Sequence, residues 1–352
     1  MRKLKKYSDI HLPVGVKMEI RKVQVTGGSS YVISLPKTWI NSMKIQKNDP
    51  LGLVTQPDNT LLITTRISGE EIEITKEFDT DSINKPDFLF RSLIGAYIAG
   101  FDNIKIKSRV RIPPFARMVV RKFTQMTIGQ EVVEETDNTI MIKDLLDPVE
   151  MPFNSTIRRM YVIVKSMFED AIKVLEERDE TLAEDVASRD NDVDRLHWLI
   201  ARQCNIILRN VNLAEKMDIS TGMIINYFLI SKIIERIGDH AVNITANVKN
   251  LENKKLDNKI IKMIKSASKI ALNIFDKSLE SLFKKNMKIS NECIEDVPKL
   301  VSTCEKINTY ALSQKGIIAI SVGYIVESIG RTGEYAADIA EGVMNHLVRG
   351  EF

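Results

Sequence analysis

Residues 235–244 return in altered form near the C-terminus. The first string reads Glu235-Arg236-Ile237-Gly238-Asp239-His240-Ala241-Val242-Asn243-Ile244, and the second reads Gly330-Arg331-Thr332-Gly333-Glu334-Tyr335-Ala336-Ala337-Asp338-Ile339. Apolar residues recur at helical spacing throughout the region that contains both strings, from Pro152 onward, with Pro298 as the one further proline. This pattern predicts an all-α domain made of two related halves.

A second internal match supports the repeat. Residues 184–186 align with residues 295–297, which places Asp190 and Asp194 opposite Val301 and Glu305. The two matches have different offsets, so we expect the halves to differ in loop length. Each half is predicted to hold about three helices, and a break at residues 256–258, with Asp257 as an N-cap, separates them.

The N-terminal part has the short alternating runs of β-structure. Residues 21–26 and 31–34 flank Gly27-Gly28-Ser29 and predict a hairpin, and residues 51–54 and 61–65 predict a second one around residues 57–60. Between the hairpins, residues 34–40 predict a short helix with Ser34 as a possible cap.

The middle of the chain mixes strands and helices and predicts a small α/β domain. The expected strands are residues 72–74, 104–106 and 139–142, and the expected helices are residues 87–99 and 114–125. The sequence therefore predicts an α+β multidomain protein. Its parts are a basic segment (1–18), a β domain (19–66), a connecting α/β domain (67–150) and a helical domain (151–352, with repeats at about 153–252 and 257–348).

Composition predicts a folded, cytoplasmic protein. Hydrophobic residues make up 44% and charged residues 28%, close to the averages of soluble proteins. No run of apolar residues is long enough to span a membrane, and polar residues follow the basic N-terminus where a signal peptide needs an apolar segment. The three cysteines are far apart and are expected to be buried, free thiols.

Charge is unevenly distributed along the chain. Residues 1–60 contain ten Lys or Arg and four Asp or Glu, which gives +6, whereas the whole chain carries +3. The N-terminal part is therefore the candidate for a polyanionic partner.

Two carboxylate pairs in the first repeat are candidate metal ligands. Asp190 and Asp194 are four residues apart, as are Glu235 and Asp239, so each pair lies on one helix face. The face of the second pair also carries apolar residues, and carboxylates that point inward need a compensating cation. Two such helices could together bind a metal ion, although all four residues could instead be solvated surface charges. His197, three residues after Asp194, is a further candidate.

The string at residues 235–244, with Asp190 and Asp194 as its partner motif, resembles the signature of PhoU-type phosphate regulators. The resemblance covers most of residues 155–348. It implies a fold of two three-helix repeats, transition metal ions such as iron or zinc on the acidic motifs, and control of phosphate uptake through the phosphate ABC transporter and a sensor. The second repeat departs from the pattern at Val301 and Gly330, so that only Glu305 and Glu334 remain as a degraded second site.

Residues 19–65 resemble the AbrB family of swapped-hairpin DNA-binding domains. The resemblance rests on residues 23–26, on Ser34-Leu35-Pro36-Lys37 and on Lys47-Asn48-Asp49, where Asn48 replaces the usual glycine. It implies a homodimer formed by two interleaved chains. It also implies DNA binding through basic residues, for which the candidates are Arg21, Lys22, Lys37, Lys44 and Lys47. Ordinary solvated cations on a dimerisation domain remain the alternative.

Three functions are compatible with these features. The first is a phosphate-responsive regulator of phosphate homeostasis that binds DNA directly. The second is an adaptor that acts on the phosphate transporter and uses its N-terminal domain only to dimerise. The third, a di-metal carboxylate enzyme, is disfavoured because the Glu-x-x-His ligands of such enzymes are absent from the helical region. The sequence therefore favours a regulatory protein over an enzyme.

Overall fold

The computed structural model describes residues 19–55, 59–65, 73–251, 254, 256–314, 316–348 and 350. The predicted basic segment 1–18 and residues 57–58 of the second predicted turn lie outside the described residues. The chain forms two compact units, residues 1–72 and residues 73–352. The division falls within the range that the sequence assigned to the connecting domain. Each unit is described by itself below.

The N-terminal unit contains two hairpins and one short helix. Its elements are β1 (Gln24–Thr26), β2 (Ser30–Val32), α1 (Lys37–Ser42), β3 (Gly52–Thr55) and β4 (Leu61–Thr64). Both hairpins are antiparallel, as predicted. Gly27 and Gly28 form the first turn with φ values of 64° and 84°, which glycine adopts without strain. The prediction that Ser34 caps the helix is wrong: α1 follows Pro36, whose fixed φ suits a helix start, and no side chain caps it.

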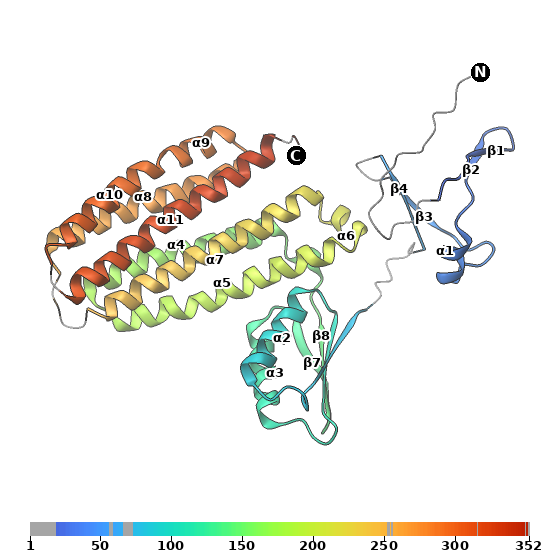
Figure 1. Ribbon diagram of the computed structural model, residues 1–352, viewed down its shortest axis with the longest axis horizontal. Helices are drawn as coiled ribbons and strands as arrows, with labels where there is room; N and C mark the ends of the chain where they lie inside the picture. The colour runs from blue at the N-terminus through green and yellow to red at the C-terminus, as the bar shows by residue number, and fades with distance from the viewer. Residues whose placement is uncertain are drawn as a thin grey trace. The chain divides into compact units, whose positions relative to one another are not determined.

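The middle domain is a four-stranded sheet with two helices on one face (Figure 1). Its elements are β5 (Thr75–Asp79), α2 (Pro86–Ile98), β6 (Asn103–Lys107), α3 (Pro114–Met126), β7 (Gln130–Glu135) and β8 (Thr139–Asp144). The strand order is β5-β6-β8-β7, and only β5 and β6 are parallel. Alternate isoleucines, Ile104 and Ile106 on β6 and Ile140 and Ile142 on β8, are buried in the core beneath the helices.

Two predictions for this domain need correction. The first strand begins at Thr75 rather than in residues 72–74, of which Ile72 is outside the described residues. The sequence also missed β7, in which five of the six residues are exposed. An edge strand of this kind buries almost nothing, so it shows little apolar alternation.

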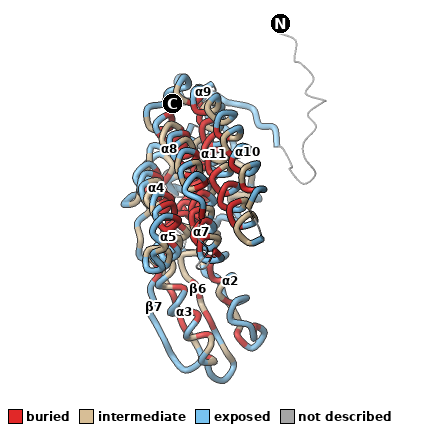
Figure 2. Tube along the Cα trace, turned by 90° about the vertical axis from the view of Figure 1, so that its left-hand side faces the viewer, coloured by how far each residue is buried: buried red, intermediate tan, exposed pale blue. Residues whose placement is uncertain are grey.

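The helical domain confirms the predicted two repeats of three long helices. The first repeat contains α4 (Phe153–Glu177), α5 (Glu180–Ile207) and α7 (Thr221–Lys249), and the second contains α8 (Asn258–Lys284), α9 (Met287–Glu295) with α10 (Val297–Ala311), and α11 (Ile317–Val348). Asp257 caps α8, as predicted, by accepting a hydrogen bond from the Lys259 backbone N–H. Buried residues follow the inward sides of the helices (Figure 2). All three cysteines are buried and free, as expected.

The repeats differ where the second helix ends or is interrupted. A short helix, α6 (Val211–Lys216), lies between α5 and α7, whereas residues 312–316 alone separate α10 from α11. This is the predicted difference in loop length. In the second repeat Pro298, which lacks a backbone N–H, stands at the start of α10, so the helix that corresponds to α5 is divided in two.

The end of α5 docks into the middle domain through a buried ion pair. Arg202, which is 2% exposed, donates to Asp144 on β8 (Nε to Oδ2, 2.7 Å) and to the carbonyl oxygen of Tyr97 on α2 (2.7 Å). The next residue, Gln203, donates to the carbonyl oxygens of Pro148 and Met151 in the connection before α4. The middle domain and the helical domain therefore share a polar joint as well as a covalent one.

Candidate functional site

Helices α5 and α7 bring the four predicted carboxylates into one electrostatic cluster. Asp190 and Asp194 lie on α5, and Glu235 and Asp239 lie on α7. A Cβ built on Gly238 would stand 3.4 Å from Asp190 Oδ1, so the absence of a side chain at Gly238 lets this carboxylate lie against α7. Glu235 is buried, Asp190 and Asp194 are half-buried, and Asp239 is exposed at the edge.

Mutual repulsion and partial burial disfavour the charged forms of these groups. Burial, followed by the charges of Asp239 and Glu235, raises the pKa of Asp190 to about 6. Burial, followed by the charges of the other three carboxylates, raises the pKa of Asp194 to about 7. Burial and then Glu235 also raise the pKa of Asp239. The cluster therefore concentrates negative charge that a cation would stabilise.

Lys232, which the sequence did not single out, supplies one resident positive charge. Its Nζ donates to both oxygens of Glu235, at 2.6 and 2.7 Å. It lies one helical turn before Glu235, a spacing that the sequence displays but that does not by itself identify a partner. Arg236 also acts on Asp239, so two cations among the described residues face four carboxylates and the cluster is short of positive charge.

His197 lies on the same side of α5 but makes a different contact. Its Nδ1 is 3.0 Å from Ser231 Oγ, and the Ser231 hydroxyl donates its proton to the carbonyl oxygen of Phe228. With the hydroxyl proton directed to Phe228, Nδ1 is the donor, which leaves a lone pair on Nε2. Burial lowers the pKa of His197 to about 4, so the ring is neutral near pH 7. A neutral imidazole with a free lone pair retains the chemistry of a metal ligand.

The donor set fits a cation in chemistry, whereas the side-chain positions do not yet converge. Carboxylate oxygens and one imidazole nitrogen are donors used by protein metal sites. Within the described part of the chain, no three His, Cys, Asp or Glu side chains are placed together so as to hold a metal ion. Binding would therefore require rotation of these side chains, including release of Glu235 from Lys232.

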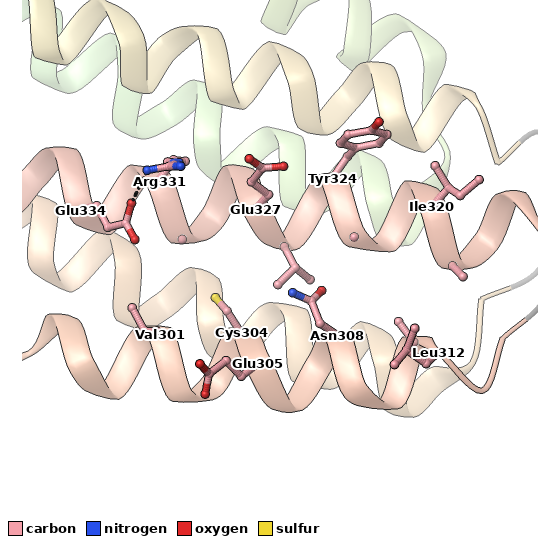
Figure 3. Close-up of a pocket in the computed structure, with 15 residues that line it drawn as sticks. Val301, Cys304, Glu305, Asn308, Leu312, Ile320, Tyr324, Glu327, Arg331 and Glu334 are labelled. Atoms are coloured by element: carbon pink, nitrogen blue, oxygen red, sulfur yellow. Dashed lines mark hydrogen bonds and ion pairs between the residues drawn. The ribbon is translucent and has the colours of Figure 1, made fainter.

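The second repeat has a groove where the first has its cluster. Residues of α10 and α11 line a pocket of about 620 Å³, among them Glu305 and Glu334 of the predicted degraded site (Figure 3). Glu334 accepts a hydrogen bond from Arg331 (2.9 Å), and Glu305 points away from α11. The groove thus does not bring these two carboxylates together.

The predicted DNA contacts lie on the surface of the N-terminal unit. Lys22, Lys37, Lys44 and Lys47 are exposed, and Arg21 forms an ion pair with Glu19. Lys44 and Asn48 adopt φ values of 55° and 74°, in the left-handed region that the turns around them require. The cations are therefore available to solvent, although one already has a partner.

Comparison with known proteins finds a similar family for each of two parts of the chain. The family described as PhoU domain matches residues 157–248, which include α5, α7 and the carboxylate cluster. The helical part is therefore similar to a PhoU domain over these residues. The family described as "Antidote-toxin recognition MazE, bacterial antitoxin" matches residues 24–75, which contain both hairpins of the N-terminal unit. The resemblances seen in the sequence are confirmed at this level.

Two relatives carry PhoU in their names. "Phosphate-specific transport system accessory protein PhoU homolog 1" of Thermotoga maritima is 24% identical over 198 residues, which cover 54% of this chain and 83% of the relative. A PhoU homolog of Clostridium acetobutylicum, also named as a phosphate-specific transport system accessory protein, is 28% identical over 137 residues, covering 38% of this chain and 60% of the relative.

Two solved PhoU structures are also similar. They come from Streptococcus pneumoniae (16% identity, TM-score 0.49) and Pseudomonas aeruginosa (20% identity, TM-score 0.49). Each covers 56% of this chain and 94% or 96% of the solved chain. Among the described residues, no helix combines the length and apolar character needed to cross a membrane.

Proposed function

We propose that this protein is a cytoplasmic regulator of phosphate uptake and homeostasis, in which a metal-binding PhoU domain is joined to a dimeric DNA-binding unit. The PhoU domain match over α5 and α7 is the observation that carries the proposal. The Thermotoga relative, named as a phosphate transport accessory protein, supports the link to phosphate. A regulatory role, rather than an enzymatic one, agrees with that name.

The metal would bind at the α5–α7 cluster. The raised pKa values of Asp190 and Asp194 mark a place where charge is uncompensated, and a transition metal such as iron or zinc would supply the missing positive charge. Asp190, Asp194, Glu235 and Asp239 would hold the ion, and Nε2 of His197 is a further donor. Lys232 would have to leave Glu235, so metal and lysine compete for the same oxygens.

The described residues of a single N-terminal unit do not form a hydrophobic core. No described residue of the unit is buried, and apolar side chains on both hairpins are exposed, among them Val25, Tyr31, Leu53 and Leu61. An isolated two-stranded hairpin is marginally stable, and an exposed apolar face of this kind marks an interface. Two chains that interleave their hairpins would cover these side chains, which supports the homodimer.

DNA is the partner that fits the charge of this unit. Residues 1–60 carry +6, and the remaining residues carry a net −3. The alternative is an adaptor that acts on the phosphate ABC transporter and uses the N-terminal dimer for assembly alone. The names of the relatives favour a transporter-linked role, so this alternative stays open.

Metal analysis of the purified protein tests the cluster. The Asp190→Ala, Glu235→Ala double variant should lose nearly all bound metal. The Glu305→Ala, Glu334→Ala variant is the matched control and should keep it, because those carboxylates lie apart from each other. Equal metal content in both variants would contradict the proposed metal site at the α5–α7 cluster.

A salt titration of DNA binding tests the N-terminal unit and separates the regulator from the adaptor. Each lost phosphate contact should flatten the log-log salt slope by about 0.9, so Arg21→Ala with Lys22→Ala should lower both affinity and slope. Lys262→Ala with Lys269→Ala, which removes two exposed cations of α8, should leave both unchanged. A dimer that binds no DNA at low salt would establish the adaptor.

A further inference from the structure

The first turns of α7 expose large apolar side chains in a regular pattern. Ile225, Phe228 and Leu229 are all exposed, Ile225 to 66%, and Lys232 follows at the next position of the same stripe. The spacing is i, i+3, i+4 and i+7, which is the pattern of anchor residues on a helix that lies in a groove of a partner. Exposed apolar side chains that lie together on one helix face also mark a site of interaction with another protein surface.

The second repeat exposes the equivalent positions of α11. The repeat places residue 235 opposite residue 330, so Ile225 corresponds to Ile320 and Leu229 to Tyr324. Both of these residues are exposed to 55%. Exposure at the same two positions of both repeats indicates a feature of the fold rather than an isolated surface residue.

The other two positions of the stripe have opposite character in the two repeats. Phe228 corresponds to Gly323, and Lys232 corresponds to Glu327. Phe228 projects an aromatic side chain, whereas a Cβ built on Gly323 would meet no atom within 4 Å among the described residues. Glu327 is exposed and has no ionic partner in the described part of the chain.

Gly323 and Glu327 both line the groove between α10 and α11. Figure 3 labels Glu327 on α11. The groove, of about 620 Å³, is otherwise largely apolar, with Cys304, Ala319 and Val326 in its lining. Its charged residues are Glu305, Glu327, Arg331 and Glu334, and Arg331 is already paired with Glu334. The groove therefore suits a helix that offers an apolar knob and a lysine one turn further on.

We propose that the α7 stripe of one copy of this chain docks in the α10–α11 groove of a second copy. Phe228 would enter the space above Gly323, and Ile225 and Leu229 would cover the apolar lining. Lys232, which would have to turn from Glu235, would approach Glu327. The occupant is a second copy because the same chain carries both the knob with its lysine and the hole with its carboxylate. A two-fold axis would form the contact twice, since each copy offers both surfaces.

Cysteine cross-linking between two tagged forms of the full-length protein tests the contact directly. One form carries Phe228→Cys and the other Gly323→Cys, both with Cys304→Ala because Cys304 lines the groove. Mixing and mild oxidation should give a disulfide-linked product that carries both tags. Val110→Cys, at an exposed position of the middle domain, replaces Phe228→Cys in the control and should give little product.

A second pair of variants separates groove filling from damage to the fold. Gly323→Leu should abolish the helical contact by occupying the groove, whereas Gly342→Leu should not, although both glycines lie on α11 with open space at the Cβ position. The readout is cross-linking between Ile225→Cys and Tyr324→Cys copies that carry each leucine. Equal cross-linking in both backgrounds, or a 228–323 product no more abundant than the control, would overturn the proposal. Neither result depends on DNA or metal binding.

Discussion

His240 of α7 and Tyr335 of α11 hold equivalent positions in the two repeats, and their rings lie against each other with centroids 5.6 Å apart. Arg236 also stands over the Tyr335 ring, with its Cζ 5.8 Å from the centroid. The two repeats therefore meet through their own corresponding residues, as expected near an axis of internal pseudo-symmetry. These helices lie side by side in the bundle (Figure 1).

A double-mutant cycle should detect this contact. His240→Ala and Tyr335→Ala should each destabilise the protein, and the double variant should lose less than the sum, with a coupling of about 1 kcal/mol. Urea denaturation of the four proteins measures the coupling. As a control, the effects of His240→Ala and Tyr324→Ala should be additive, because Tyr324 is an exposed tyrosine on the same helix as Tyr335.

The carboxylate cluster should destabilise the metal-free protein increasingly as the pH rises from about 4 to about 7. The folded pKa values of Asp190 and Asp194 are raised to about 6 and about 7, so between the unfolded and folded values the native state binds more protons than the unfolded state. The contribution of these two carboxyls to stability must then fall with increasing pH, whereas His197, whose folded pKa of about 4 lies below its ordinary value, contributes with the opposite sign. Denaturation at pH 5 and pH 8 in the presence of a chelator measures this.

The difference in stability between the Asp190→Asn, Asp194→Asn variant and the wild type isolates the carboxyls, and it should shift in favour of the variant as the pH rises over the same window. Added metal should have a similar effect in the wild type, because a cation stabilises the charged carboxylates. A variant with the full pH dependence of the wild type would show that the carboxylates do not interact in solution.

Breaking the joint between the two domains should be costly. Arg202→Met leaves Asp144 buried without its partner, and loss of one member of a buried pair costs about 3–5 kcal/mol. Arg331→Met, which breaks an exposed pair with Glu334, should cost at most about 1 kcal/mol. Adding Asp144→Asn to Arg202→Met should recover part of the loss, since the orphaned charge is gone. Equal losses in the two single variants would contradict this account.

Gly333 should not tolerate a methyl group. A Cβ at this position would stand 2.1 Å from Cδ2 of Leu300, which is itself fully buried. Gly333→Ala should therefore destabilise the protein by about 1–3 kcal/mol. Gly342→Ala on the same helix has open space and should stabilise by up to about 1 kcal/mol. If the clash is the cause, Leu300→Ala should make Gly333→Ala less costly, which denaturation of the combined variant would reveal.

The repeat and its helices could be predicted from the sequence, because burial of one helix face places apolar residues at every third or fourth position. The strand β7 could not be predicted in this way, because almost all of its residues are exposed and its sequence therefore shows no alternation of apolar and polar residues. The carboxylate pairs were predictable from four-residue spacing, which fixes the face of a helix. The capture of Glu235 by Lys232 was not, because many exposed lysines lie one turn from a carboxylate, and only the packing of α7 shows which of them is held. The outward direction of Glu305 likewise depends on how α10 packs.

The uninterrupted course of α5 has an optical consequence. Asp194 and Arg202 lie eight residues apart on one helix, a separation of about 12 Å at the rise of an α-helix. Between them Trp198 packs partly against the core of the middle domain, and the chain has two tryptophans in all. Because no hinge interrupts α5, a displacement at its carboxylates should change the environment of this indole, so the protein carries a native fluorophore at the joint between α5 and the sheet.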